Sequence, residues 1–332
     1  MNRYGYKVAF IGSLLSHTIA SFCFLFIQPE ISHFYVLVIC GIARSFRGVG
    51  DALIKTTASA YVKQDKGGRS KLIQLLIGGK DTTKGIGILT GGFLLTSIGI
   101  FSSFIALGLV TAICTFIALI FIKDHRENKI IDDFKGFLRV RKQMKYLSLA
   151  RAFLYSGRDL WLVIPIPVFA VKANIEPSIT GSILAAGVIG FGIAQPFFNA
   201  VLRKKNRLKN KWKRRPLLIW APFVLAVLTT SLLWIPSSIE NFIWVIFAYN
   251  IFAALATVPH NHFELKFARR KRASADIAYY KTISHIGKVF AVLASGYLYD
   301  KFGLNGCLLA ACFVLLIASF IGFILRKPCK KA

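Results

Sequence analysis

Eight basic side chains stand within apolar stretches of the sequence. They are Arg44, Arg47, Lys80, Lys84, Arg151, Arg158, Lys281 and Lys288. An ionisable side chain at the centre of a membrane helix costs about 2.5 to 3.5 kcal/mol on insertion scales, so it marks a functional site by default. The planar fork of Arg and the point charge of Lys both bind phosphate and carboxylate groups. These residue types therefore predict a site for an anion that carries several charges.

The spacing of these cations is helical. One face of the run near 34–61 carries four charges within an arc of roughly 80° when residues are placed about 100° apart; they are Arg44, Arg47, Asp51 and Lys55. A second face, in YYKTISHIGK, carries Lys281, His285 and Lys288. The first of these faces is expected to line one side of a cavity.

The acidic residues in the same runs have two interpretations. They can form internal ion pairs that hold the helices together, namely Arg47–Asp51, Asp81–Lys84 and Arg158–Asp159. They can also titrate, which makes Asp51, Asp81, Asp159 and His285 the candidates for proton coupling. Even with all three acids paired, five cations would lack a carboxylate partner: Arg44, Lys55, Arg151, Lys281 and Lys288. Buried unpaired cations are unfavourable unless an anion or water reaches them.

The elements that position these residues are apolar runs long enough to cross a membrane. The chain of 332 residues is 55% hydrophobic and 17% charged, with a mean hydropathy of +0.58. A membrane helix needs roughly 20 mostly apolar residues, and about ten such runs occur. They lie near 8–27, 34–61, 71–96, 99–122, 146–171, 178–202, 216–235, 242–267, 275–298 and 304–325. Pro165 and Pro167 are expected to kink the fifth run.

The connectors alternate between basic and nearly uncharged. Lys and Arg total 43 against 14 Asp and Glu, a formal charge of +29, and much of this excess lies in every second connector. Basic connectors stay in the cytoplasm, which places both termini and the connector 123–145 on that side of a plasma or inner membrane. The charge is thereby explained by topology and contact with anionic lipid rather than by nucleic acid.

The connector 123–145 divides the chain unequally. Residues 1–122 hold four runs as a partial N-terminal bundle, 146–326 hold six as a C-terminal bundle, and 327–332 form a basic tail. Transporters with alternating access usually have two repeated halves around a central site, so two spans are expected to be missing from the N-terminal half.

Other chemistry is not predicted. The six cysteines form no CxxC pair, so neither a metal site nor a disulfide framework is expected. His260, His262 and Glu264 in PHNHFEL are interpreted as the polar cytoplasmic end of a span. No nucleophile motif or phosphate loop suggests an enzyme, and no cofactor is expected.

Four segments resemble a known family. GRSKLIQLLIGGKDTTKGIGILTGG, GRDLWLVIPIPVF and IAYYKTISHIGKVFAVLASGYLYD, together with the stretch from Gly41 to Lys55, are similar to the ArsJ-type organoarsenical efflux permeases of the major facilitator superfamily. The resemblance implies an all-α integral membrane bundle that lacks the first two family spans. It also implies export of 1-arseno-3-phosphoglycerate, an acyl-arsenate formed by a functionally linked glyceraldehyde-3-phosphate dehydrogenase.

Two alternatives remain open beside this hypothesis. The chain could be a transporter of the same superfamily that carries another organic anion or organophosphate. It could also be a truncated membrane protein that does not transport, left as a gene-model artefact, a fragment or a degenerate copy. In each case membrane lipid is the expected surrounding and a monomer the expected state.

Overall fold

A computed structural model describes residues 5–27, 33–64, 69–121, 140–206, 216–234, 239–269 and 273–326. The chain divides into two compact units. Unit 1 comprises Met1–Gly67, Leu94–Leu138 and Arg270–Ala278, and unit 2 comprises Gly68–Phe93, Arg139–Arg269 and Tyr279–Ala332.

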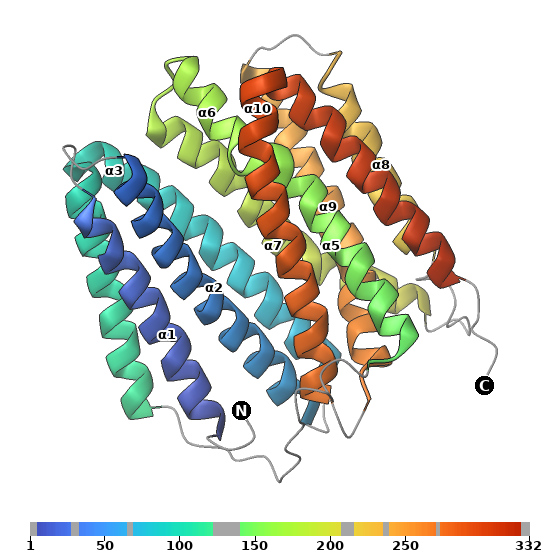
Figure 1. Ribbon diagram of the computed structural model, residues 1–332. Coiled ribbons are helices and arrows are strands. Elements are labelled where there is room, and N and C mark those ends of the chain that lie inside the picture. Colours follow the sequence, from blue (N-terminus) through green and yellow to red (C-terminus); the bar gives the residue numbers. More distant parts are fainter. Residues whose placement is uncertain are drawn as a thin grey trace. The chain divides into compact units, whose positions relative to one another are not determined.

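The described residues form helices and no strand, which confirms the predicted all-α fold class (Figure 1). The helices are α1 (Gly5–Cys23), the 3-10 helix η1 (Phe24–Phe26), α2 (His33–Gln64), α3 (Arg69–Phe121), α5 (Lys142–Leu162), α6 (Pro165–Lys172), α7 (Pro177–Asn206), α8 (Leu217–Ser231), α9 (Ile239–Phe267) and α10 (Ala273–Arg326).

Two of these helices are interrupted by a glycine with positive φ. Gly99 in α3 has φ 76° and ψ 173°, and Gly303 in α10 has φ 64° and ψ −161°. A side chain disfavours this backbone conformation, whereas glycine adopts it readily. Each glycine therefore separates two helical arms, and each arm corresponds to one of the expected apolar runs.

A third break separates α5 from α6. The helix α5 ends at Leu162, and α6 begins at Pro165 after two turn residues. Proline lacks a backbone N–H and suits the first turn of a helix, so Pro165 starts a new helix instead of continuing the old one. The expected kink in the fifth run is confirmed.

Six helical segments of the described chain are long and apolar enough to cross a membrane. They are Lys7–Phe26, Thr82–Phe121, Lys142–Lys172, Pro177–Leu202, Ile243–Phe267 and Ala275–Leu325. The segment Leu217–Ser231 is apolar but shorter. The helix α2 is not among the six, although 32 residues are long enough, because its charged face lowers its apolar content.

Unit 1 packs α1 against α2 through small residues. The hydroxyl of Ser13 donates to the backbone oxygen of Gly50 over 2.7 Å. A Cβ atom on Gly50 would lie 2.9 Å from the backbone oxygen of Ser13. Close backbone approach at small residues is typical of helices in lipid, where burial of apolar surface drives packing less than in water.

Unit 2 contains the larger apolar core, centred on α5, α8, α9 and α10. Trp161 and Tyr249 are buried there and meet edge to face with ring centroids 5.1 Å apart. The first arm of α3 joins this unit through α7, where a Cβ atom on Gly92 would lie 3.3 Å from the backbone oxygen of Pro177. This core fixes the face of α5 that carries the basic residues.

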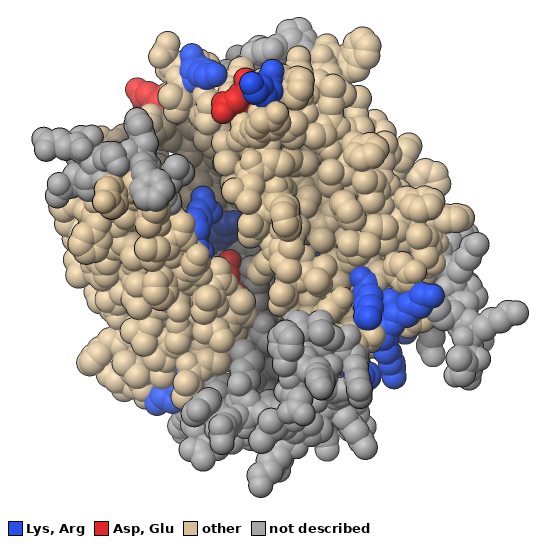
Figure 2. Space-filling view, in the orientation of Figure 1, with Lys and Arg blue, Asp and Glu red and all other residues tan. Residues whose placement is uncertain are grey.

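The outer surface is largely apolar. Large side chains such as those of Trp244, Phe290 and Leu293 are 72%, 67% and 68% exposed. In Figure 2, Lys, Arg, Asp and Glu occupy only a small part of the visible described surface. Lipid rather than water is the solvent that such a surface matches.

Candidate anion site

The helix α5 presents three residues of the candidate site on one face. Arg151, Tyr155 and Arg158 follow one another at intervals of four and three residues, which places them side by side along a helix. Lys288 of α10 approaches the same aromatic ring. The Cζ atoms of Arg151 and Arg158 lie 4.3 and 5.4 Å from the centroid of the Tyr155 ring, and the Nζ atom of Lys288 lies 4.1 Å from it. Three cationic groups thus lie within cation–π distance of the Tyr155 ring.

Arg151 is the most deeply buried of these cations, with 3% of its surface exposed. It donates to the hydroxyl of Tyr155 and, over 3.5 Å, to the backbone oxygen of Thr257 in α9. Both acceptors are neutral. Its Nε has no hydrogen-bond partner, and among the described residues no carboxylate forms an ion pair with it. The sequence-based prediction that Arg151 lacks an acidic partner agrees with this geometry.

Arg158 has an acidic partner next to it in the sequence. Its Nε and one terminal nitrogen lie 2.8 and 2.7 Å from Oδ1 of Asp159. The predicted Arg158–Asp159 ion pair is therefore present. The charges of Lys288 and Lys84 also act on this carboxylate. We call the group Arg151, Tyr155, Arg158, Asp159 and Lys288 the Tyr155 cluster.

A close helix contact brings Lys288 to the ring. A Cβ atom on Gly287 would lie 2.9 Å from Cβ and 3.0 Å from the backbone oxygen of Ala152, which leaves no room for a side chain between α10 and α5. The hydroxyl of Ser156 donates to the backbone oxygen of Gly287 over 2.8 Å. The close approach of the helices at Gly287 therefore sets the distance between Lys288 and the ring of Tyr155.

Lys281 differs from the expectation. The sequence left it without an acidic partner, but its Nζ lies 3.1 Å from Oε2 of Glu264 in α9. Glu264 is 3% exposed and lies close to the end of the span Ile243–Phe267, so this end of the span is polar and buried at this residue. The i, i+4 spacing of His260 and Glu264 could have indicated a shared face of α9, since residues four apart are neighbours on a helix.

Other buried polar atoms surround this ion pair. His260 Nδ1, Glu264 Oε1 and the hydroxyl of Tyr280 have no hydrogen-bond partner among the described residues, and all three residues are at most 3% exposed. The charges of Glu264 and Arg151 act on one another. The charge of Glu264 in this ion pair therefore interacts with the charge of Arg151 in the Tyr155 cluster.

Among the other predicted residues, Lys84 acts on the cluster through the carboxylate of Asp159. Arg44 and Arg47 belong to α2 in unit 1 and are exposed. Asp51, expected to pair with Arg47, contacts His17 of α1 at 3.9 Å. Lys84 is exposed and His285 is partly buried in unit 2. The side chains of Lys55, Lys80 and Asp81 lie outside the part that the structure describes.

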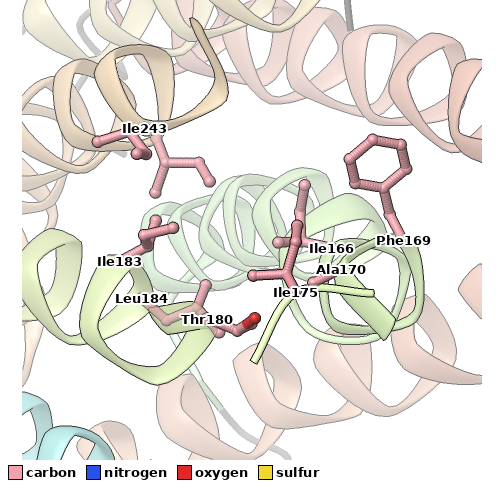
Figure 3. Close-up of a pocket in the computed structure, with 9 residues that line it drawn as sticks. Ile166, Phe169, Ala170, Ile175, Thr180, Ile183, Leu184 and Ile243 are labelled. Carbon is pink, nitrogen blue, oxygen red and sulfur yellow. The ribbon is translucent and has the colours of Figure 1, made fainter. Parts of the chain in front are cut away.

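An apolar pocket in unit 2 is separate from the basic residues. It is lined by Ile166, Phe169, Ala170, Ile175, Thr180, Ile183, Leu184, Ile243 and Ile246. Figure 3 shows aliphatic side chains from α6, α7 and α9 converging on it, with the hydroxyl of Thr180 as the one oxygen drawn. Such a lining lacks the charges that an anion requires. Within the described residues, no group of three or more His, Cys, Asp or Glu side chains could hold a metal ion.

Comparison with known proteins identifies one family. The family model described as Major Facilitator Superfamily matches residues 1–259 and, in a second alignment, residues 147–331. No curated protein matches the chain.

Proposed function

The chain belongs to the major facilitator superfamily and is a multi-pass secondary membrane transporter; from this premise we propose that its cargo is a phosphorylated organic anion, exported from the cell. The observation that carries this proposal is the Tyr155 cluster. Three cations share one aromatic ring, and the cluster contains a single carboxylate. Arg151 donates only to neutral acceptors, and a phosphate-bearing ligand would add negative charge beside it.

Among such anions we favour 1-arseno-3-phosphoglycerate. The resemblance of GGKDTTKGIG and GRDLWLVIPIP to organoarsenical permeases supports this choice. Its phosphate and arsenate groups both match the cationic chemistry of the cluster. In this proposal the protein resides in the plasma or inner membrane, works as a monomer, and depends on a glyceraldehyde-3-phosphate dehydrogenase that makes the cargo.

Two forces could drive the export. An inside-negative potential of 100 mV contributes about 2.3 kcal/mol for each negative charge that leaves the cell. Proton antiport would use a titrating group, for which Asp51, Asp81, Asp159 and His285 are the candidates. Collapsing the potential and the pH gradient separately during transport would distinguish the two.

A second class of cargo is supported by the chemical groups that the Tyr155 cluster offers to a ligand. The cluster offers charge and an aromatic face, neither of which distinguishes arsenate from phosphate. A sugar phosphate or another organophosphate would therefore suit it equally.

Arsenate tolerance tests the choice between these cargoes. The full chain is expressed in an arsenate-sensitive host with and without the dehydrogenase, and growth is measured over a range of arsenate concentrations. We expect tolerance only when both proteins are present, and loss of tolerance in Arg158→Ala at normal protein levels. Tolerance that never depends on the dehydrogenase would overturn the organoarsenical proposal and leave the organophosphate alternative.

A further inference from the structure

Three buried side chains of unit 2 each carry a polar atom that no described residue satisfies. Arg151 of α5, Glu264 of α9 and Tyr280 of α10 are 3%, 3% and 1% exposed. Their atoms Nε, Oε1 and the phenolic hydroxyl have no hydrogen-bond partner among the described residues. Buried polar atoms are nearly always hydrogen-bonded, to protein or to water, so three such atoms in one place indicate a site for a polar partner.

Contacts between three helices bring these atoms to one place. Arg151 donates to the backbone oxygen of Thr257, which stands about two turns before Glu264 on the same face of α9. The Nζ atom of Lys281 lies 3.1 Å from Oε2 of Glu264 and 5.5 Å from the centroid of the Tyr280 ring. The charge of Arg151 acts on both Glu264 and Tyr280. We call Arg151 Nε, Glu264 Oε1 and the Tyr280 hydroxyl the Tyr280 site.

The chemical types of these atoms define the group that fits them. Arg151 Nε and the Tyr280 hydroxyl can each donate a hydrogen bond, whereas the Glu264 carboxylate, ion-paired with Lys281, can only accept. An alcohol has one proton to donate and two lone pairs that accept, so a single hydroxyl group satisfies all three atoms. His260 Nδ1, also unpartnered among the described residues, donates or accepts according to its tautomer and is compatible with the same group.

We propose that the Tyr280 site binds a hydroxyl group of the cargo, so that the protein recognises a hydroxylated organic phosphate. This inference rests on the proposed function and names a chemical group of the ligand within it. Arg151 belongs to both the Tyr155 cluster and the Tyr280 site, so one guanidinium connects the two. A site built to hydrogen-bond a hydroxyl discriminates against an analogue that lacks it, because its buried polar groups are then left unpaired.

Tyr280→Phe tests the site with the smallest change. It removes the hydroxyl and keeps the ring that Lys281 approaches. Because that hydroxyl has no partner among the described residues, its loss should leave the thermal midpoint equal to that of the wild type or slightly higher. The matched control is Tyr299→Phe, which removes the hydroxyl of another buried tyrosine of α10, whose ring instead faces Lys172 at 4.9 Å.

The ligands of the test differ only in the hydroxyl group. 3-Phosphoglycerate carries a phosphate, a carboxylate and a hydroxyl, whereas 3-phosphonooxypropionate carries the same two acidic groups without the hydroxyl. Their dissociation constants are measured by titration calorimetry on the full chain purified in detergent. We expect the wild type to bind 3-phosphoglycerate about thirty times more tightly than the analogue.

The variants show whether this preference arises at the Tyr280 site. We expect Tyr280→Phe to reduce the preference to about fivefold or less by weakening the binding of 3-phosphoglycerate, while its affinity for the analogue stays close to that of the wild type. We expect Tyr299→Phe to keep the wild-type preference.

The outcomes separate this inference from the proposed function. Equal binding of the two ligands by the wild type would show that the Tyr280 site holds water alone, and it would overturn the inference while the proposed function stands. An unchanged preference in Tyr280→Phe, or an equal loss in Tyr299→Phe, overturns the inference as well. A wild type that binds neither ligand overturns the proposed function itself.

Discussion

Arg151 and Lys281 show how two buried cations of one unit can differ. Arg151 donates to a hydroxyl and a backbone oxygen, both neutral. Lys281 forms an ion pair with Glu264 over 3.1 Å. Removing one partner of a buried ion pair leaves an uncompensated charge, whereas removing an unpaired cation relieves the cost of burying it. The two residues should therefore respond differently to substitution.

Replacement of Arg151 by Met separates binding from stability. We expect Arg151→Met to lose anion transport by about tenfold or more while its thermal midpoint in detergent stays equal to that of the wild type or rises by a few degrees. Transport in vesicles and thermal unfolding of the purified protein measure the two effects. Retained transport together with a clear fall in the midpoint would show that Arg151 is structural.

At the scale of elements, the pair Glu264–Lys281 joins α9 to α10. Both residues are largely buried, with side-chain exposures of 4% and 16%. Glu264→Gln and Lys281→Met are each expected to destabilise unit 2 by about 3 kcal/mol, and the double variant should recover most of that loss. Thermal unfolding of the three variants measures this. Additive losses in the double variant would contradict a direct interaction.

The contact between α5 and α10 depends on Gly287. A methyl group at this position would lie 2.9 Å from Cβ of Ala152, so Gly287→Ala must push the helices apart and move Lys288 relative to Tyr155. We expect weaker anion binding and a loss of about 1 to 3 kcal/mol in stability. Gly296→Ala on the same helix is the control, because no atom lies within 4 Å of its added Cβ. Equal binding by the two variants would show that the approach does not position Lys288.

The sequence predicted the helices well, because apolar length and connector charge are local signals. It did not predict that Gly99 and Gly303 would interrupt α3 and α10 with positive φ. Glycines are frequent in these helices, and nothing in the local pattern distinguishes an interrupting glycine from a packing one. The break before Pro165 was predictable because proline cannot donate the backbone hydrogen bond.

The candidate site was predicted only in part. Arg151, Arg158 and Lys288 were recognised by their charge in apolar runs, but Tyr155 was not, since a tyrosine in a membrane helix is common. Its role arises from the cations that surround it in three dimensions. The acidic partner of Lys281 was not predicted for a similar reason, because Glu264 is 17 residues away and on another helix.

At the scale of the whole molecule, the connector charges give a topology that can be tested directly. The basic connectors predict that both termini face the cytoplasm. A fluorescent protein fused to the C-terminus should fluoresce, and an alkaline phosphatase fused there should be inactive because that enzyme needs an oxidising compartment. An active phosphatase fusion would reverse the predicted orientation.

Transport of a phosphorylated anion by this chain is the central claim, and everted membrane vesicles test it most directly. Radiolabelled 3-phosphoglycerate, which carries a phosphate and a carboxylate and no labile acyl-arsenate, is offered to the outer face of the vesicles, the former cytoplasmic side. We expect saturable accumulation in vesicles with the wild-type chain and with the control Tyr299→Leu, which removes the ring that Lys172 approaches to 4.9 Å. We expect about tenfold less accumulation with Arg158→Ala. Accumulation no greater than in vesicles without the protein, or equal accumulation with Arg158→Ala at matched protein levels, would contradict the assigned function.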